Sequence, residues 1–212
     1  MATATALASA VGNNGSIIAL TYSGCPNIAF GNLKEHPGCD LFNSQILDRI
    51  SELNSQAPVF LVSRSMHYIE NKAVNFSKEN KSNVSYAKSF TKSYSDMACA
   101  IRKKNHVFLV NPIPEMPVNV PRYISHSLMT GNKVEDIYTT VLLYKTKNKI
   151  ILDAQNETSK ACDVKILEPT NYLCRAGICY GSQNLQPLYF DDNHMSESGN
   201  KILIPMFKSA LN

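Results

Sequence analysis

Four short apolar runs set the strongest limit on how this chain can fold. They are Ser16–Thr21, Val59–Val62, Val107–Val110 and Val164–Leu167. Apart from Lys165, the runs are mainly apolar and lack the alternation of a half-exposed strand, so both faces of each predicted strand are expected to be covered. Amphipathic stretches separate the runs, which is typical of a parallel sheet packed between helices. We therefore predict an α/β fold: a three-layer α/β/α arrangement with a mostly parallel sheet.

Helical spacing fills the intervals between these runs. The predicted helices are one in the small residues at the amino terminus that ends at Gly-Asn-Asn-Gly, one capped by Asp40 and reaching Leu53, one containing Phe90–Ile101, one over Val134–Lys149, and a final one capped by Ser196 and kinked at Pro205. The polar stretch at residues 70–85 is expected to be a surface excursion. With no internal repeat and no linker, residues 1–212 are predicted to be a single domain.

Charge and hydropathy exclude several classes of protein. The net charge of +4 is spread along the chain, and its densest basic patch, Ile101–His106, is typical of a solvated helix end rather than a nucleic-acid surface. No apolar run approaches the ~20 residues that span a membrane. The amino terminus lacks the basic region and the apolar core of a signal peptide. We thus expect neither a nucleic-acid partner nor a transmembrane segment in this sequence.

The six cysteines favour an oxidising compartment. Cys25 and Cys39 bracket a loop rich in Pro, Gly and Asn, and Cys174 and Cys179 bracket a tight turn. We predict two disulfides, Cys25–Cys39 and Cys174–Cys179. The alternatives are six free thiols or a zinc site, but only the second pair has zinc-ligand spacing and no partner pair lies nearby. Cys99 lies on an apolar helical face and is expected to be buried and inert; no partner is assigned to Cys162.

Polar chemistry is concentrated at "PLYFDDNHMSESGNKILIP", between an apolar run and the last helix. Asp191 and His194 are three residues apart, so the carboxylate can accept a hydrogen bond from one imidazole nitrogen and leave the other free as a base. A Ser nucleophile requires such an imidazole. The alternative is a helix-entry turn in which His194 is simply exposed. A metal site is less favoured, because no other ligand has suitable spacing, and no cofactor is expected.

The surrounding residues resemble a known family. "CRAGIC…PLYFDDNHMSESGNKILIP", the "SGCP…C" loop and "VFLVSRSMHY" are similar to the SGNH hydrolase superfamily. More narrowly, they resemble the SGNH domain fused to membrane-bound acyltransferases of the acyltransferase family 3 type, which O-acylate bacterial surface glycans. The resemblance spans nearly the whole chain and is strongest at its carboxyl end.

The resemblance implies roles for particular residues. His194 would be the base and Asp191 the residue that orients it. Gly24 would offer a backbone N–H to an oxyanion, and Arg64 or Ser63 would replace the Asn that many SGNH enzymes use.

The family begins with a strand and a Gly-Asp-Ser-His block, whose Ser is the nucleophile. Neither has a counterpart in this sequence, and residues 4–20 resemble the helix that comes directly after that block in the family. We expect the nucleophile to be absent from this chain; Ser23, Ser63 and Ser65 are the alternatives near strand ends.

Three functions are compatible with these observations. The first is the SGNH part of a bacterial acyltransferase that O-acylates, most simply O-acetylates, cell-surface polysaccharide on the extracytoplasmic side of the membrane. Its partners would be an acyl donor, a glycan acceptor and a membrane acyltransferase domain, and the chain alone would be inactive. The second is a non-catalytic SGNH-like module that binds carbohydrate or a partner. The third is an unrelated protein of a reducing compartment with a chance Asp-x-x-His.

Overall fold

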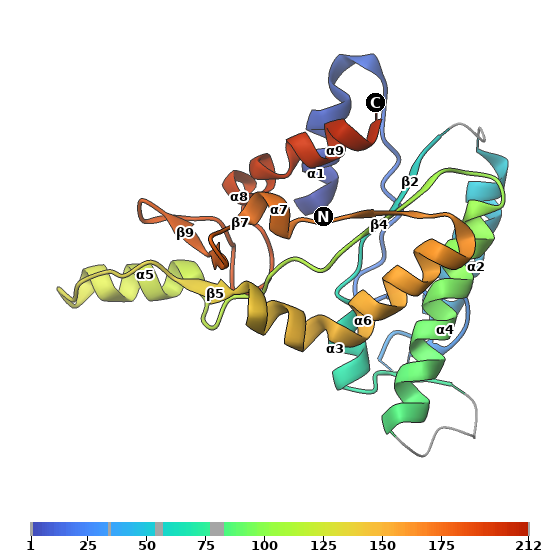
Figure 1. Ribbon diagram of the computed structural model, residues 1–212, viewed down its shortest axis with the longest axis horizontal. Coiled ribbons are helices and arrows are strands. Elements are labelled where there is room, and N and C mark those ends of the chain that lie inside the picture. The colour runs from blue at the N-terminus through green and yellow to red at the C-terminus, as the bar shows by residue number, and fades with distance from the viewer. Residues whose placement is uncertain (1, 34, 54–56, 77–82, 212) are drawn as a thin grey trace. The chain divides into compact units, whose positions relative to one another are not determined.

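The computed structural model describes residues 2–33, 35–53, 57–76 and 83–211 (Figure 1). Its helices and strands confirm the predicted mixed α/β class with a parallel sheet. The chain divides into two compact units. One comprises Leu20–Pro112 and Asn148–Leu167; the other comprises Met1–Ala19, Ile113–Lys147 and Glu168–Asn212. The single domain over residues 1–212 stays a prediction, and the units are described in turn.

The first unit contains the parallel sheet. Its strands are β2 (Val59–Leu61), β4 (Val107–Val110) and β6 (Lys165–Leu167), in the order β2-β4-β6. Both pairings are parallel, with Phe60 opposite Phe108 and Leu109 opposite Ile166. All four side chains of β4 are buried. Burial on both faces explains the uninterrupted apolar run of β4. Three of the four predicted strands are confirmed, as β2, β4 and β6.

Helices supply the rest of this unit's core. They are α2 (Cys39–Glu52), α3 (Ser65–Glu70), α4 (Asn83–Arg102) and the part of α6 (Val141–Cys162) from Asn148 onwards, with a short ladder of β1 (Asn32–Leu33) and β3 (Val74–Asn75). The predicted stripe of α4 is buried, including Phe90 and Tyr94. The Tyr94 hydroxyl accepts a hydrogen bond from Gln155 Nε2 of α6 at 3.0 Å, and the same amide nitrogen donates to the Val110 carbonyl at 3.2 Å. The cap of α2 is Gly38 rather than Asp40, which lies in the first turn.

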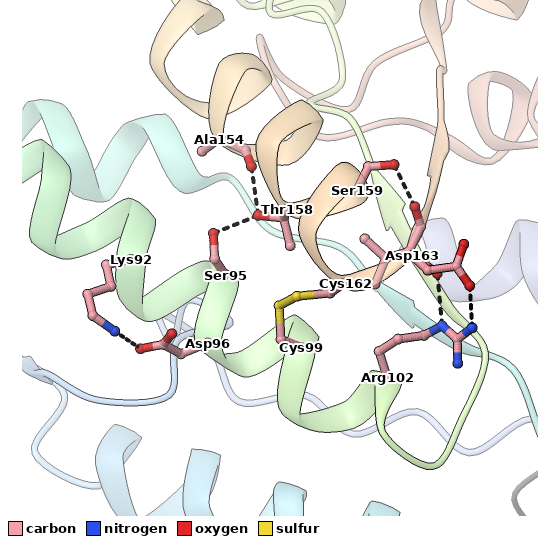
Figure 2. Close-up of a disulfide and its surroundings, with 11 residues drawn as sticks. Lys92, Ser95, Asp96, Cys99, Arg102, Ala154, Thr158, Ser159, Cys162 and Asp163 are labelled. Atoms are coloured by element: carbon pink, nitrogen blue, oxygen red, sulfur yellow. Dashed lines mark hydrogen bonds and ion pairs between the residues drawn. A yellow bond between two sulfur atoms is a disulfide. The ribbon is translucent and has the colours of Figure 1, made fainter.

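A disulfide ties α4 to α6. Cys99 and Cys162 are joined with Cα atoms 5.4 Å apart (Figure 2). The expectation of an inert buried thiol at Cys99 was therefore wrong. Cys99 lies beside the buried stripe of α4 rather than within it, and there it meets the last residue of α6. The Arg102 guanidinium contacts the Asp163 carboxylate at 2.5 Å next to the disulfide, so the same two helix ends are joined twice.

The second unit is built from helices and an antiparallel sheet. Its elements are α1 (Ala2–Val11), the 3-10 turn Gly12–Asn14, α5 (Val120–Met129), β5 (Tyr138–Thr140), α7 (Thr170–Leu173), β7 (Cys174–Arg175), β8 (Ile178–Tyr180), β9 (Ser182–Gln183), β10 (Gln186–Pro187), α8 (Glu197–Ile202) and α9 (Ile204–Leu211). The sheet order is β5-β8-β7, and α1 packs against α8 and α9 (Figure 1). The last predicted helix is broken at Leu203, two residues before Pro205, as the missing N–H of proline requires.

Two predicted elements are wrong. Ser16–Thr21 is not a strand: the described residues form no ladder with it, and Ile18 is 63% exposed. An apolar run becomes a strand only where a neighbour accepts its hydrogen bonds. The start of the predicted Val134–Lys149 helix is also wrong, because Tyr138–Thr140 pairs with β8 and the helix begins at Val141. Its β-branched Thr139 and Thr140 favour the extended form. The predicted excursion lies partly at residues 77–82, outside the described residues.

Candidate active site

A tight loop between β10 and α8 carries the predicted dyad. Tyr189 and Met195 form an antiparallel bridge, and Phe190 donates its backbone N–H to the His194 carbonyl at 2.7 Å. Ser196 ends the loop: its N–H bonds the Leu188 carbonyl at 2.9 Å, and its hydroxyl accepts the Gly199 N–H as the cap of α8. The loop is thus closed on itself and fixed to α8.

Within this loop, one carboxylate organises the backbone and the imidazole together. Asp191 Oδ1 accepts the backbone N–H groups of Asn193 at 2.8 Å and of His194 at 2.7 Å. Asp191 Oδ2 lies 2.7 Å from Nδ1 of the His194 ring. This contact leaves Nε2 as the outward nitrogen, and the imidazole side chain is 70% exposed. The arrangement is that of an oriented general base.

Electrostatics keep the carboxylate ionised. Burial opposes ionisation of Asp191, but the hydrogen bonds from the backbone N–H groups of His194 and Asn193, together with the His194 ring, outweigh it and lower its pKa below 3.8. A carboxylate that accepts several N–H bonds is stabilised as the anion. Asp191 therefore stays negative at neutral pH.

The segment before α5 supports the loop from outside. Met116 donates its N–H to the Asp192 carbonyl at 2.7 Å, and Val120 donates to the Asp191 carbonyl at 3.1 Å. The buried Tyr189 hydroxyl donates to the Pro114 carbonyl at 2.7 Å. Sequence reasoning missed this support, because contacts between residues more than seventy positions apart leave no local pattern. The one available signal was the "NPIPE" segment after an apolar strand.

Two family-like features brace the same region. The Cys174–Cys179 disulfide closes the β7–β8 hairpin with Cα atoms 3.9 Å apart. Gly199, in the first half of α8, lies so close to Leu188 that an added Cβ would clash with its carbonyl oxygen and lie 2.5 Å from Met195 Cε. A glycine is therefore required where α8 crosses the strand that enters the loop.

The residues predicted to bind an oxyanion or substrate lie in the other unit. The "SGCPN" loop meets the end of β2, since Asn27 Nδ2 donates to the Val62 carbonyl at 3.1 Å. Gly24 in this loop has φ +76°, and a Cβ there would lie 2.6 Å from His36 Cδ2, so the position requires glycine. Cys25 in the same loop is bonded to Cys39 of α2. The structure thus brings the Gly24 loop to the strand end that leads into Ser63 and Arg64.

Ser63 and Arg64 come soon after the end of β2. The Ser63 hydroxyl oxygen is buried and has no hydrogen-bond partner among the described residues. Arg64 precedes α3, is exposed, and its charge acts on the Tyr68 hydroxyl. Because the dyad belongs to the other unit, the placement of His194 near Gly24 and Arg64 stays a prediction.

The alternative serine nucleophiles have ordinary surroundings. Ser23 is exposed in a turn, and Ser65 is the buried first residue of α3. Within the described ranges, no hydroxyl is hydrogen-bonded to the His194 ring. Nor does any group of three or more metal-ligating side chains occur in the part of the chain that the structure describes. The same part contains no helix that is both long and apolar enough to cross a membrane.

Two comparisons with known proteins found a similarity. The family model described as "SGNH domain (fused to AT3 domains)" matches residues 1–209. Among solved structures, the periplasmic domain of the Salmonella ser. Paratyphi A lipopolysaccharide acetyltransferase is similar, with a TM-score of 0.70 over 99% of this chain and 78% of that one. The sequences are 15% identical, so this likeness concerns the fold. No curated protein matches the sequence.

Proposed function

Because the chain belongs to the family of SGNH domains fused to AT3 domains, we propose that it is the SGNH part of an acyltransferase that O-acetylates a cell-surface polysaccharide. The observation that carries the proposal is the contact between Asp191 Oδ2 and His194 Nδ1 at 2.7 Å, with Nε2 turned outward. The similar Salmonella domain comes from a lipopolysaccharide acetyltransferase, which supports an acetyl group and a glycan as the two substrates.

His194 acts as the proton carrier in this proposal. Its Nε2 first accepts the proton of a nucleophilic hydroxyl as that oxygen attacks the acyl carbonyl, and then returns the proton to the leaving group. In the second half, Nε2 takes the proton of a sugar hydroxyl as that oxygen attacks the acyl-enzyme carbonyl. It then returns the proton to the enzyme oxygen, whose bond to the acyl group breaks, so that the enzyme hydroxyl is restored. Asp191 stabilises the imidazolium in both halves and stays ionised itself.

This scheme requires a nucleophilic hydroxyl, and no residue of the sequence has been assigned that role. No Gly-Asp-Ser run occurs in the 212 residues. The proposal is therefore that the 212-residue polypeptide does not turn over alone, and that the family-type Gly-Asp-Ser-His block supplies the serine. Ser63, with a buried hydroxyl and no described partner, is the first alternative to test within this sequence, then Ser23 and Ser65.

The proposed location is the extracytoplasmic side of a bacterial membrane, next to an AT3 domain that delivers the acyl donor. Three disulfides support it: Cys25–Cys39, Cys99–Cys162 and Cys174–Cys179. They take up all six cysteines, and structural disulfides persist in oxidising compartments. The fusion named for the family supports a membrane acyltransferase domain as the partner.

Trapping the acyl-enzyme tests this function. A polypeptide with a family-type strand ending in Gly-Asp-Ser-His placed before Ala2 is mixed with an activated acetyl ester and quenched in acid. Intact-mass and peptide-mass spectrometry should locate one acetyl group on the grafted serine. His194→Ala in the same polypeptide should remove that label, while Lys201→Ala on exposed α8 should keep it. If the grafted polypeptide folds but is never acetylated, the proposal that the domain is an acyltransferase is rejected.

A non-catalytic binding module is the second candidate. It is favoured by the absence of a Gly-Asp-Ser run together with a well-formed loop at residues 190–194, whose first and last residues are exposed. In that case glycan binding should be unaffected by His194→Ala, and neither the grafted nor the original polypeptide should form an acyl-enzyme.

A further inference from the structure

The loop that carries the dyad also presents an aromatic ring that the proposed chemistry does not use. Phe190 is 76% exposed, whereas the preceding Tyr189 is 1% exposed. Among the described residues, the Phe190 ring has no aromatic partner. Single exposed apolar side chains are common on proteins, so exposure by itself indicates little. The position of this ring relative to His194 is what makes it informative.

Register places the Phe190 and His194 side chains on the same face. Tyr189 is opposite Met195 in the bridge, so Phe190 is opposite His194, and the bond from the Phe190 N–H to the His194 carbonyl confirms that pairing. Successive side chains of an extended segment point to opposite faces. Tyr189 and Met195 are both buried, so the next pair outward turns its two rings to solvent. Side chains directly opposite in such a pair have Cβ atoms about 5 Å apart.

The backbone that carries the ring is also held in place. Asp191 fixes the turn through the N–H groups of Asn193 and His194, and the Asp191 and Asp192 carbonyls are bonded to Val120 and Met116. A flat apolar side chain therefore projects from a fixed backbone next to His194. Little backbone conformational entropy remains to be lost when a ligand lies on it.

We propose that Phe190 is the platform on which the acceptor sugar stacks, and that it thereby helps to select the acceptor. This inference rests on the proposed acetyl transfer to a glycan. The C–H face of a pyranose matches a phenyl ring in size and polarity, and its hydroxyl groups project from the rim toward the neighbouring imidazole. An acetyl group is a poorer match, because a ring with three quarters of its surface in water cannot enclose a methyl group.

The chain contains no Trp, which provides a direct test of binding without turnover. Phe190→Trp places a unique fluorophore on the proposed platform, and Tyr138→Trp places one on β5 in the same unit, where the Tyr138 side chain is 51% exposed. Methyl glycosides of glucose, galactose, mannose and fucose are titrated at millimolar concentrations. At least one should change the emission of Phe190→Trp saturably and leave that of Tyr138→Trp unchanged. No saturable change with any of the four would overturn the platform.

Conservative variants separate stacking from simple hydrophobic contact. Binding is followed by the amide chemical shifts of residues 190–196, using the glycoside that changed the Trp emission. Phe190→Tyr should bind this glycoside with the same affinity as the original chain. Phe190→Leu, of similar apolar size but without a ring, should bind about tenfold more weakly. Equal binding by Phe190→Leu, or a response to an acetyl thioester but to no glycoside, would overturn the proposal.

This readout is independent of the acyltransferase proposal. If glycosides bind at Phe190 while the serine-bearing polypeptide never becomes acetylated, the platform stands and the proposed chemistry fails. If the acyl-enzyme forms but substitutions of Phe190 do not change glycoside binding, the proposed chemistry stands and the stacking platform is rejected.

Discussion

The Asp191 carboxylate contacts His194 twice, through Oδ1 to its backbone N–H and through Oδ2 to its ring Nδ1, both at 2.7 Å. The first contact fixes the backbone at this residue and the second fixes how its ring is turned. A single side chain thus sets both the path of the loop and the orientation of the imidazole. Structural and chemical roles of Asp191 can be separated by substitutions that remove one contact at a time.

Removing the carboxylate should destabilise the fold measurably. Asp191→Ala leaves the N–H groups of Asn193 and His194 without their acceptor, and we expect a loss of about 1–3 kcal/mol in the free energy of unfolding. Asp191→Asn keeps an oxygen acceptor and should lose less. Urea unfolding measures both. As a control, Asp153→Ala removes only an exposed pair with Lys149 and should cost about 0.5 kcal/mol or less. Equal losses at positions 191 and 153 would show that the loop does not depend on the carboxylate.

The lowered pKa of Asp191 predicts an acid dependence. A carboxyl group whose pKa is lower in the folded than in the unfolded chain stabilises the fold above its ordinary pKa of 3.8. That contribution is lost as the pH falls through the folded-state value below 3.8. The difference in unfolding free energy between the original chain and Asp191→Asn should therefore be constant near neutral pH and shrink in acid. A difference that stays flat down to about pH 2 would contradict the assigned interactions.

Two of the three disulfides should differ in how much they contribute to the free energy of unfolding. Cys99 and Cys162 are 63 positions apart in sequence, whereas Cys174 and Cys179 are five apart. Loop-closure entropy then predicts a loss of about 4 kcal/mol for Cys99→Ala with Cys162→Ala, against about 2 kcal/mol for the hairpin pair. Urea unfolding of the two double variants tests the order. A larger loss for the hairpin pair would show that local strain or residual structure outweighs loop length.

Gly199 should resist even the smallest substitution. Alanine favours helices over glycine by about 1 kcal/mol, so Gly199→Ala would stabilise an unobstructed α8. Here the added methyl clashes with the Leu188 carbonyl, and we expect a net loss of about 1–3 kcal/mol. Lys201→Ala, on the exposed side of the same helix, should stay within about 0.5 kcal/mol of the original chain. A stabilised Gly199→Ala would show that the loop can move away.

The sequence predicted a feature correctly where the residues in contact are close together in the chain, or where a segment is buried on all sides. Val107–Val110 was predictable because all four of its side chains are buried, which leaves an unbroken apolar run. The contact of Asp191 with His194 was predictable because three residues of loop suffice to make it. Pro205 likewise prevents one continuous helix over this segment, and it is tolerated in the first turn of α9.

The failures share a different cause. Ser16–Thr21 has the composition of a buried strand, but exposure of Ile18 depends on which segments lie beside it, and composition does not specify them. Cys162 gave no sign of its partner, since the partner lies on a helix 63 positions earlier. The support of the loop by Met116 and Val120 is equally distant in sequence. Each missed feature depends on which remote parts of the chain do or do not come together.

The central claim is that His194 activates a serine that the Gly-Asp-Ser-His block provides. The most direct measurement is the rate of nitrophenyl acetate hydrolysis by three folded polypeptides: the 212-residue chain, the chain with the family-type strand grafted before Ala2, and the graft carrying His194→Ala. The first should show negligible activity, the second should turn over, and the third should fall by about a thousandfold or more. If the ungrafted chain hydrolyses the ester rapidly and this activity depends on His194, the claim is contradicted and the nucleophile lies within the 212 residues; Ser63 and Ser23 would be replaced first. If the grafted polypeptide folds but hydrolyses nothing, the non-catalytic binding module is the better explanation.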